Sequence, residues 1–187
     1  LAMLADLDVL RALHPALGWT DTTAGWFAAA RQAAFPDVAL ADIYLALALY
    51  MLNTADRTQF AAQYRLPGSE IRLLEDITSV QARVGRLRDS AVADSMIDRV
   101  LHGLGTTALR AAQIVEPDPV SRHIRRYIEY LRGVKLAVDG KYLESLGLRP
   151  GPRFGDLLAE LRAAHLDGYA QTREQQEAWI QHAIQSG

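Results

Sequence analysis

Positively charged side chains are concentrated in one segment of the chain, where their type and spacing suit them to bind phosphate. The 187 residues include 20 basic and 22 acidic ones, so the formal net charge is −2. From Ser121 to Arg153, eight basic residues stand against three acidic ones, which gives that segment +5 and the remainder −7. The eight are Arg122, Arg125, Arg126, Arg132, Lys135, Lys141, Arg149 and Arg153. Such an asymmetry indicates a polyanion-binding face, although arginines on a helix can also be simply its solvated side.

Two carboxylates near the start of the chain have the spacing of a catalytic metal site. Asp6 and Asp8 form the Asp-x-Asp pattern that holds magnesium in two-metal nucleotidyl transfer. On a helix, residues two apart point about 200° away from each other, so these two cannot chelate one ion. No Gly-Ser pair or strand pattern precedes them. We therefore predict no catalytic residue in this chain.

The remaining candidates for metal or thiol chemistry are few. The five histidines show no metal-ligand spacing, and each is expected at the surface or at its boundary. The chain has no cysteine, which excludes thiolate zinc sites, thiol catalysis and disulfides and suits a cytoplasmic protein. We predict no metal and no cofactor within these residues.

The segment that follows the arginines predicts a helix hairpin. Gly147 can end a short helix in a left-handed cap, and Pro150 with Gly151 forms a tight turn that we expect to need a positive φ at Gly151. Pro152 then starts the next helix, because its missing N–H would be unpaired there in any case.

The start of that second helix suits phosphate. Its first N–H groups have no partner within the helix and carry the positive end of the helix dipole. Gly155 leaves the approach open, and Arg149 and Arg153 add charge on either side. The same residues also make a sound hairpin with no ligand, and the pattern alone leaves both interpretations open.

Helical periodicity recurs along the whole chain, which predicts an all-α fold of about ten or eleven helices. Thr20 or Asp21, Pro36 and Ser69 are expected near helix starts, and Thr172 with Gln175 has the pattern of a capping box. The expected helices cover 1–13, 20–34, 36–52, 55–64, 69–88, 93–101, 106–115, a stretch from 120 onward, 141–146, 152–165 and 172–185.

The organisation into domains follows from one break in this pattern. The segment 116–119, Glu-Pro-Asp-Pro, interrupts helical periodicity twice and is the predicted linker. It separates a helical body domain, residues 1–116, from a helical tail domain, residues 117–187. The tail opens with a helix that has one apolar stripe and an arginine-rich remainder.

No membrane segment is expected. The apolar run 40–52 is too short to span a bilayer and predicts a buried central helix. The chain begins without methionine and without the layout of a signal peptide. We expect it to be part of a longer protein.

The stretch "DGKYLESLGLRPGPRFGDLLAELRAAHLDGYAQTREQQEAWI" resembles the terminal segment of the class II tRNA nucleotidyltransferases, the CCA-adding and A-adding enzymes of the poly(A) polymerase family. The opening "LADLDVLRALHPAL" is similar, more weakly, to the start of that family's body region. The matching positions are Gly140, Leu143, Leu146, Gly147, Leu148, Pro150, Gly151, Pro152, Leu166, Asp167, Gly168, Thr172, Arg173 and Glu174.

The resemblance implies addition of CCA, or of its terminal A, to tRNA 3′ ends by the parent enzyme, with Mg²⁺ and with ATP and CTP as substrates. It also implies that a helical body and tail grip the acceptor and T arms of tRNA, while a head holds the catalytic carboxylates and a neck selects the base. Neither head nor neck is recognisable in this sequence. The expected partners are therefore tRNA and the enzyme's own head and neck.

We thus predict an RNA-binding C-terminal region that is inactive as a polymerase on its own. Its predicted RNA-binding residues are Arg122, Arg125, Arg126, Lys141, Arg149, Gly151, Arg153 and Gly155. The alternative is a helical protein-interaction or oligomerisation module that makes no RNA contact. Whether the parent adds CCA, A alone or poly(A) depends on the head and neck.

Overall fold

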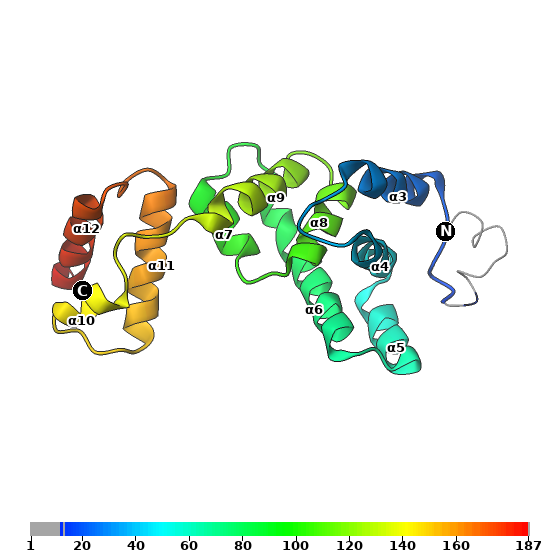
Figure 1. Ribbon diagram of the computed structural model, residues 1–187, viewed down its shortest axis with the longest axis horizontal. Coiled ribbons are helices and arrows are strands. Elements are labelled where there is room, and N and C mark those ends of the chain that lie inside the picture. Colours follow the sequence, from blue (N-terminus) through cyan, green and yellow to red (C-terminus); the bar gives the residue numbers. More distant parts are fainter. Residues whose placement is uncertain (1–11, 13, 187) are drawn as a thin grey trace.

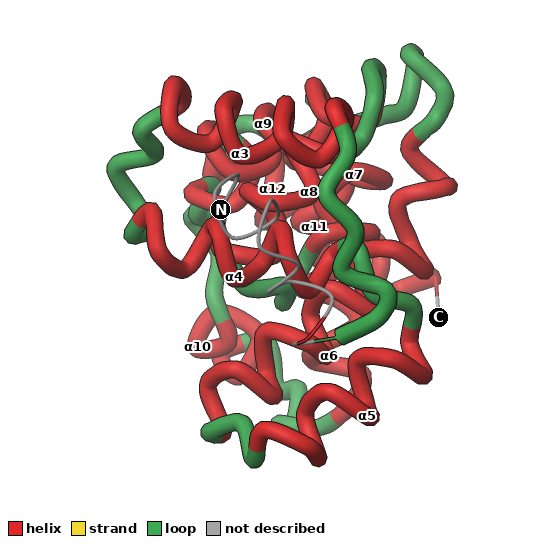
Figure 2. The backbone as a smooth tube through the Cα atoms, turned by 90° about the vertical axis from the view of Figure 1, so that its right-hand side faces the viewer, coloured by secondary structure: helices red, strands yellow, loops and turns green. Residues whose placement is uncertain are grey.

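Helices form all the regular structure in the described part of the computed structural model, which comprises residues 12 and 14–186 (Figures 1 and 2). The all-α prediction is confirmed. The helices are α3 (Asp21–Ala33), α4 (Leu40–Tyr50), α5 (Thr54–Tyr64), α6 (Gly68–Arg83), α7 (Asp94–Leu101), α8 (Thr106–Val115), α9 (Val120–Glu129), α10 (Gly140–Ser145), α11 (Pro152–Leu166) and α12 (Arg173–Ser186), with short 3-10 helices at Val84–Leu87 and Leu131–Gly133. The expected helix over 1–13, with Asp6 and Asp8, lies outside the described residues.

Local capping residues fix several helix ends where the sequence predicts them. Thr20 caps α3, and its hydroxyl accepts from the Thr23 N–H at 3.2 Å. At α12 the predicted capping box is complete: the Gln175 N–H donates to Thr172 Oγ1 at 3.3 Å, and the Thr172 N–H donates to Gln175 Oε1 at 3.0 Å. These ends agree because caps are made between residues close in sequence.

One predicted helix start is wrong, and one predicted cap is not made. Pro36 does not open α4, which begins at Leu40 after the extended residue Ala39, and Asp37 in the preceding turn forms a tertiary ion pair with Arg110 at 2.9 Å. Ser69 is not the cap of α6, which begins one residue earlier after Pro67, and the Ser69 hydroxyl donates instead to Glu70.

The helices form two lobes, each with its own hydrophobic core, and we call them the first and second lobe. The first core is built from α3, α4 and α6–α9 and extends along the chain to Leu131; the second is built from α10–α12 and begins at Val138. In Figure 1 the second lobe lies beyond α7 and α9, joined to them by a single thin connection. The α4 helix is the buried central helix that its apolar run predicts.

The boundary between the cores therefore lies between Leu131 and Val138, not at the predicted 116–119. The proline segment is clamped to the first lobe on both sides. The Tyr50 hydroxyl donates to Glu116 at 2.6 Å, and the Ser121 hydroxyl donates to the Gln113 carbonyl at 2.6 Å. Beyond it, α9 buries Ile124 and its apolar neighbours in the first core, so the prolines mark a turn within a lobe.

A buried arginine fastens α5 to the rest of the first lobe. Arg57 is only 2% exposed, and its guanidinium donates to the Leu49 carbonyl at 3.1 Å, to Thr78 Oγ1 at 2.8 Å and to Gln81. All three acceptors are neutral, and burial lowers the pKa of Arg57 below its ordinary value.

Among the described residues, none of the helices combines the length and the apolar character of a membrane span.

The placement of α9 in the first lobe can be tested by cutting back its core residue Ile124. Ile124→Ala removes a fully buried side chain, and such truncations cost about 2–5 kcal/mol. Hydrogen exchange should show lost protection in α8, while α10–α12 keep theirs. Leu143→Ala, at a fully buried site of the second core, should do the reverse. Loss of protection confined to α10–α12 in Ile124→Ala would restore the boundary at 116–119.

Candidate nucleic-acid interface

The α9 helix presents its arginines on one side because its other side is apolar. Ile124 and Tyr127 are buried with Val120, whereas Arg122 and Arg125 are exposed. This separation follows from helical spacing alone. The exposed side lines an open groove of about 450 Å³, which we call the arginine groove. Its lining residues are Ser90, Arg122, His123, Arg125, Arg126, Glu129 and Tyr130.

The three arginines of this groove differ in how far they are neutralised. Arg126 makes a two-pronged ion pair with Asp94 at the start of α7, with both distances 2.6 Å, and this hydrogen bonding raises the pKa of Arg126. Arg122 lies 3.7 Å from Asp118, and both side chains are more than half exposed. Arg125 has no ion pair or hydrogen bond among the described residues. Arg125 is therefore the most available charge, followed by Arg122.

An exposed aromatic ring completes the groove. Tyr130 is 65% exposed and directly follows α9. His123 Nε2 lies 2.9 Å from the Asp89 carbonyl oxygen and holds the loop that carries Ser90 against the groove. An exposed aromatic ring beside guanidinium groups can stack on a base. The prediction omitted Tyr130, whose signal is its position off the apolar stripe of α9.

The other predicted residues lie on the hairpin of the second lobe. Lys141, Arg149 and Arg153 are all exposed, and so are Gly151 and Gly155. Asp139 caps α10 by accepting from the N–H groups of Lys141 at 3.0 Å and Tyr142 at 3.2 Å. Pro152 opens α11 as predicted, and no side chain caps that end.

Only one of the two glycines in the hairpin turn has a backbone conformation that favours glycine. Gly147 has φ +83°, the left-handed cap that the sequence predicts. Gly151 has φ 174° and ψ −174°, an extended conformation, so the expected positive φ at this residue is wrong. A Cβ at Gly151 would come no closer than 3.9 Å to the Arg149 carbonyl oxygen, so the position has room for a side chain. The chain therefore turns over residues 148–151 without a left-handed residue at Gly151, and Pro152 then begins α11.

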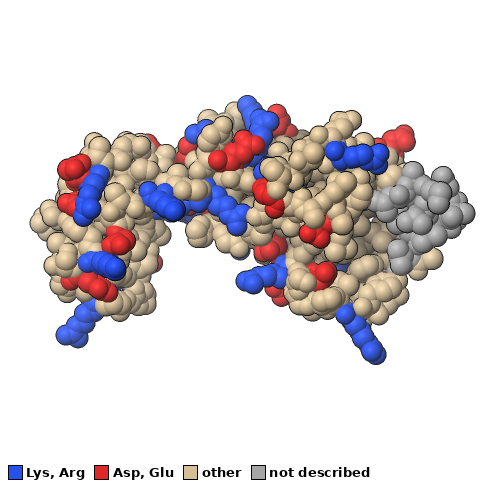
Figure 3. Space-filling view, in the orientation of Figure 1, with Lys and Arg blue, Asp and Glu red and all other residues tan. Residues whose placement is uncertain are grey.

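We expected the two groups of basic residues to share one surface. The structure places them on different lobes instead. The arginine groove belongs to α9 in the first lobe, and the hairpin joins α10 to α11 in the second. Both views place α9 and α10 far apart (Figures 1 and 2). Lysine and arginine side chains are nevertheless visible on both lobes and on the narrow part between them (Figure 3).

No residues suited to metal chemistry are grouped in the described part of the chain. No cluster of three histidine, aspartate or glutamate residues there could hold a metal ion. The chemistry that the arrangement supports is the recognition of negatively charged groups by guanidinium groups.

Two of three comparisons match the chain to known proteins. No family model matches it. It is 30% identical over 124 residues to the A-adding tRNA nucleotidyltransferase of Geobacter sulfurreducens, a match that covers 65% of this chain and 14% of that protein. It shares its fold with a solved structure, described as the complex structure of CCA-adding enzyme with ATP, at a TM-score of 0.76 and 17% identity; this match covers 99% of the chain and 46% of the other. The chain thus spans less than half of either protein.

The difference between the two hairpin glycines gives a direct test. Gly147→Ala should destabilise the second lobe by about 1–2 kcal/mol, the cost of left-handed backbone for a residue with a side chain. Gly151→Ala should change stability by no more than about 0.5 kcal/mol, because it is exposed and extended. Chemical denaturation of the two variants measures this. Equal losses at both positions would contradict the described turn.

Proposed function

We propose that this chain, which is related to the tRNA nucleotidyltransferases, forms an RNA-binding part of such an enzyme and grips tRNA by its phosphates. The arginine groove carries the proposal. It combines an unpaired arginine, a weakly paired one and an exposed tyrosine in one open hollow. The hairpin with Lys141, Arg149 and Arg153 offers a second exposed basic face, with Gly151 and Gly155 leaving its approach open.

The mode of binding follows from the chemistry of the partner. The bases of an RNA duplex face a deep and narrow groove that side chains cannot enter, so a helical protein recognises its shape and its phosphates. Arginine suits this task because its planar fork can donate two hydrogen bonds to one phosphate. The proposed target is the acceptor and T arm of tRNA, in the cytoplasm.

The polymerase chemistry is proposed to belong to other domains of the enzyme. There, a head would bind Mg²⁺ with ATP or CTP and a neck would select the base, so those two domains are the proposed protein partners. The choice between CCA, A and poly(A) addition would lie with them. The residues described here would hold the tRNA while its 3′ end is extended.

The first test removes the two most available charges of the groove. Replacing Arg122 and Arg125 by alanine should weaken tRNA binding and reduce the magnitude of the slope of log affinity against log salt concentration by roughly 1 to 2. The slope falls because binding releases fewer counterions when fewer phosphates are neutralised. Stability should stay within about 0.5 kcal/mol, since both side chains are exposed. Affinity measured against salt concentration, with a thermal melt, gives both values.

A matched control separates a local effect from bulk charge. Arg72 and Arg86 are exposed in the first lobe outside the groove, and their double alanine variant removes the same charge. It should leave the slope nearly unchanged. An unchanged affinity and slope in the folded groove variant would reject the groove as the RNA site. Binding that is indifferent to salt would favour a protein-interaction module instead.

A second test addresses the division of labour. The chain alone, incubated with tRNA, Mg²⁺ and ATP or CTP, should incorporate no nucleotide, because the described residues offer no carboxylate cluster for the metal ions. Incorporation of labelled nucleotide by a preparation free of other polymerases would overturn the proposal that the head is required.

A further inference from the structure

The second lobe meets the first at one pair of helices, α7 and α11. The two cores are separate, and the chain crosses between them once, over residues 132–137. The other contact lies between α7 and α11. It includes two polar connections, one from Arg162 and one from Asp167, and Leu166, which packs against the first core. The side chains of Arg162 and Asp167 therefore make directional connections between the lobes.

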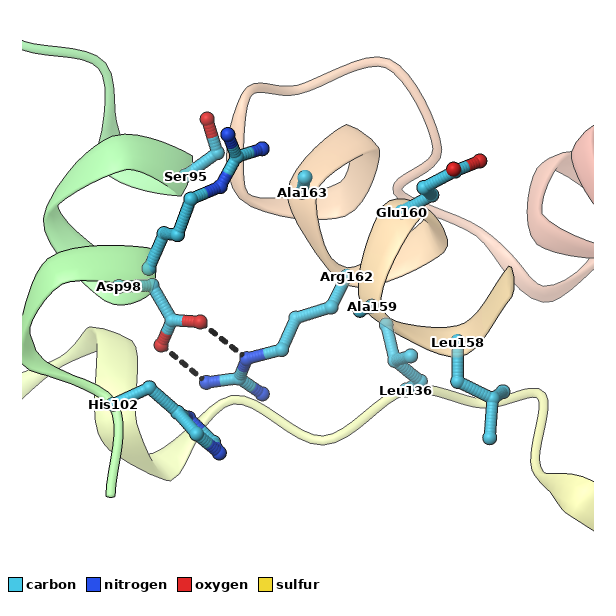
Figure 4. A pocket seen from close by; sticks show the side chains of 10 residues that line it. Ser95, Asp98, His102, Leu136, Leu158, Ala159, Glu160, Arg162 and Ala163 are labelled. Carbon is cyan, nitrogen blue, oxygen red and sulfur yellow. Dashed lines mark hydrogen bonds and ion pairs between the residues drawn. The ribbon is translucent and has the colours of Figure 1, made fainter. Parts of the chain in front are cut away.

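Arg162 reaches from α11 into the junction and satisfies three groups of the first lobe and the crossing segment. Its Nε and Nη2 atoms donate to the two carboxylate oxygens of Asp98 at 2.8 and 2.9 Å (Figure 4). Nη2 also donates to the Leu131 carbonyl, and Nη1 donates to the Val134 carbonyl, both at 2.8 Å. The same guanidinium thus holds α7 and the segment where the chain crosses.

The junction beside this ion pair is not filled by apolar side chains. A pocket of about 470 Å³ lies between α7 and α11, with Asp98 and Arg162 in its wall and Leu136 and Leu158 among its lining (Figure 4). The pocket leaves part of the contact between α7 and α11 without close packing. The hydrogen bonds of Arg162 beside it therefore add directional constraints on how the two helices meet.

Asp167 makes the second connection, at the start of α7. The helix has no cap from its own chain neighbours. Asp167 supplies it from the second lobe: its carboxylate accepts from the Ser95 N–H at 2.9 Å and from the Ser95 hydroxyl at 2.6 Å. Gly168, with φ +89°, turns the chain at the end of α11 so that Asp167 is presented there. A carboxylate at a helix start is stabilised by the unpaired N–H groups and the helix dipole.

We propose that Arg162 and Asp167 are positioning residues, which set the second lobe so that the hairpin and the arginine groove hold one tRNA at the same time. The inference rests on the proposed function. Two binding faces in a fixed arrangement act at a high effective concentration, and this advantage disappears when the arrangement is lost. Neither residue needs to touch the RNA.

The orientation itself can be measured without RNA. The chain has no cysteine, so Ala82→Cys on α6 and Ala178→Cys on α12, both at exposed positions, can carry a pair of spin labels. The labelled protein should give one narrow distance distribution. Asp167→Ala should broaden or shift it, and so should Asp98→Asn combined with Arg162→Gln, which avoids leaving one buried charge alone. Asp156→Ala, which removes an exposed carboxylate from α11, should leave it unchanged.

The consequence for binding is measured on the same variants. Asp167→Ala should weaken the binding of whole tRNA by about tenfold or more. It should leave unchanged the affinity for a short RNA duplex of about one helical turn, whose binding does not require both faces at once. In this variant, adding Arg149→Ala with Arg153→Ala should cost less tRNA affinity than it does in the wild type, because the hairpin is already uncoupled. A variant that merely misfolds would lose the short duplex as well.

Each outcome decides one point. An unchanged distance distribution in both junction variants overturns the positioning role, whatever the RNA measurements show. A changed distribution with unchanged tRNA affinity also overturns it, since the orientation would then be irrelevant to binding. If the wild type binds neither tRNA nor the duplex, the proposed function fails, and the distances still establish whether Arg162 and Asp167 orient the lobe.

Discussion

The arrangement of the two lobes depends on the guanidinium of Arg162. Only its planar fork can satisfy a carboxylate with two parallel bonds and still reach two carbonyl oxygens on the crossing segment. Removing one partner of such a pair costs about 3–5 kcal/mol, because the other charge stays behind in a poorly solvated place. Asp98 is only 6% exposed, so the same penalty applies to it. The cost of removing one partner therefore reflects the charge left unpaired, and does not measure a net contribution of the ion pair to stability.

The features of the fold that could be predicted from the sequence are those decided within a turn or two of helix. The cap at Thr20, the box at Thr172 and the proline start of α11 are all of this kind. The lobe boundary could not be predicted in this way. Two prolines show that a helix ends, but they do not show where the next one packs. The apolar stripe of α9 suits either core, and only Tyr50, Ser121 and the tertiary fit assign it to the first.

Charge on the candidate site was harder to predict, because counting residues along the chain ignores partners that are distant in sequence. The +5 segment is partly neutralised by Asp94, which lies outside it and occupies Arg126. Arg57 and Arg110 count as basic residues, yet both are buried and serve the first lobe. Conversely, Asp167 stood out only as part of the Leu-Asp-Gly resemblance, and its hydrogen bonds to Ser95 give that residue a physical role.

The ion pairs of Arg126 and Arg122 reduce the number of charges that the groove can offer to phosphates. With Arg126 committed to Asp94 and Arg122 weakly paired, the groove offers about two phosphate contacts, too few for tight binding at physiological salt. The hairpin adds comparable charge, but on another lobe. For the proposed RNA binding, a near-neutral chain with small, separated basic faces would gain affinity from their geometry. Geometry of that kind requires a defined junction, to which this chain contributes the contact of α7 with α11 and the hydrogen bonds of Arg162 and Asp167.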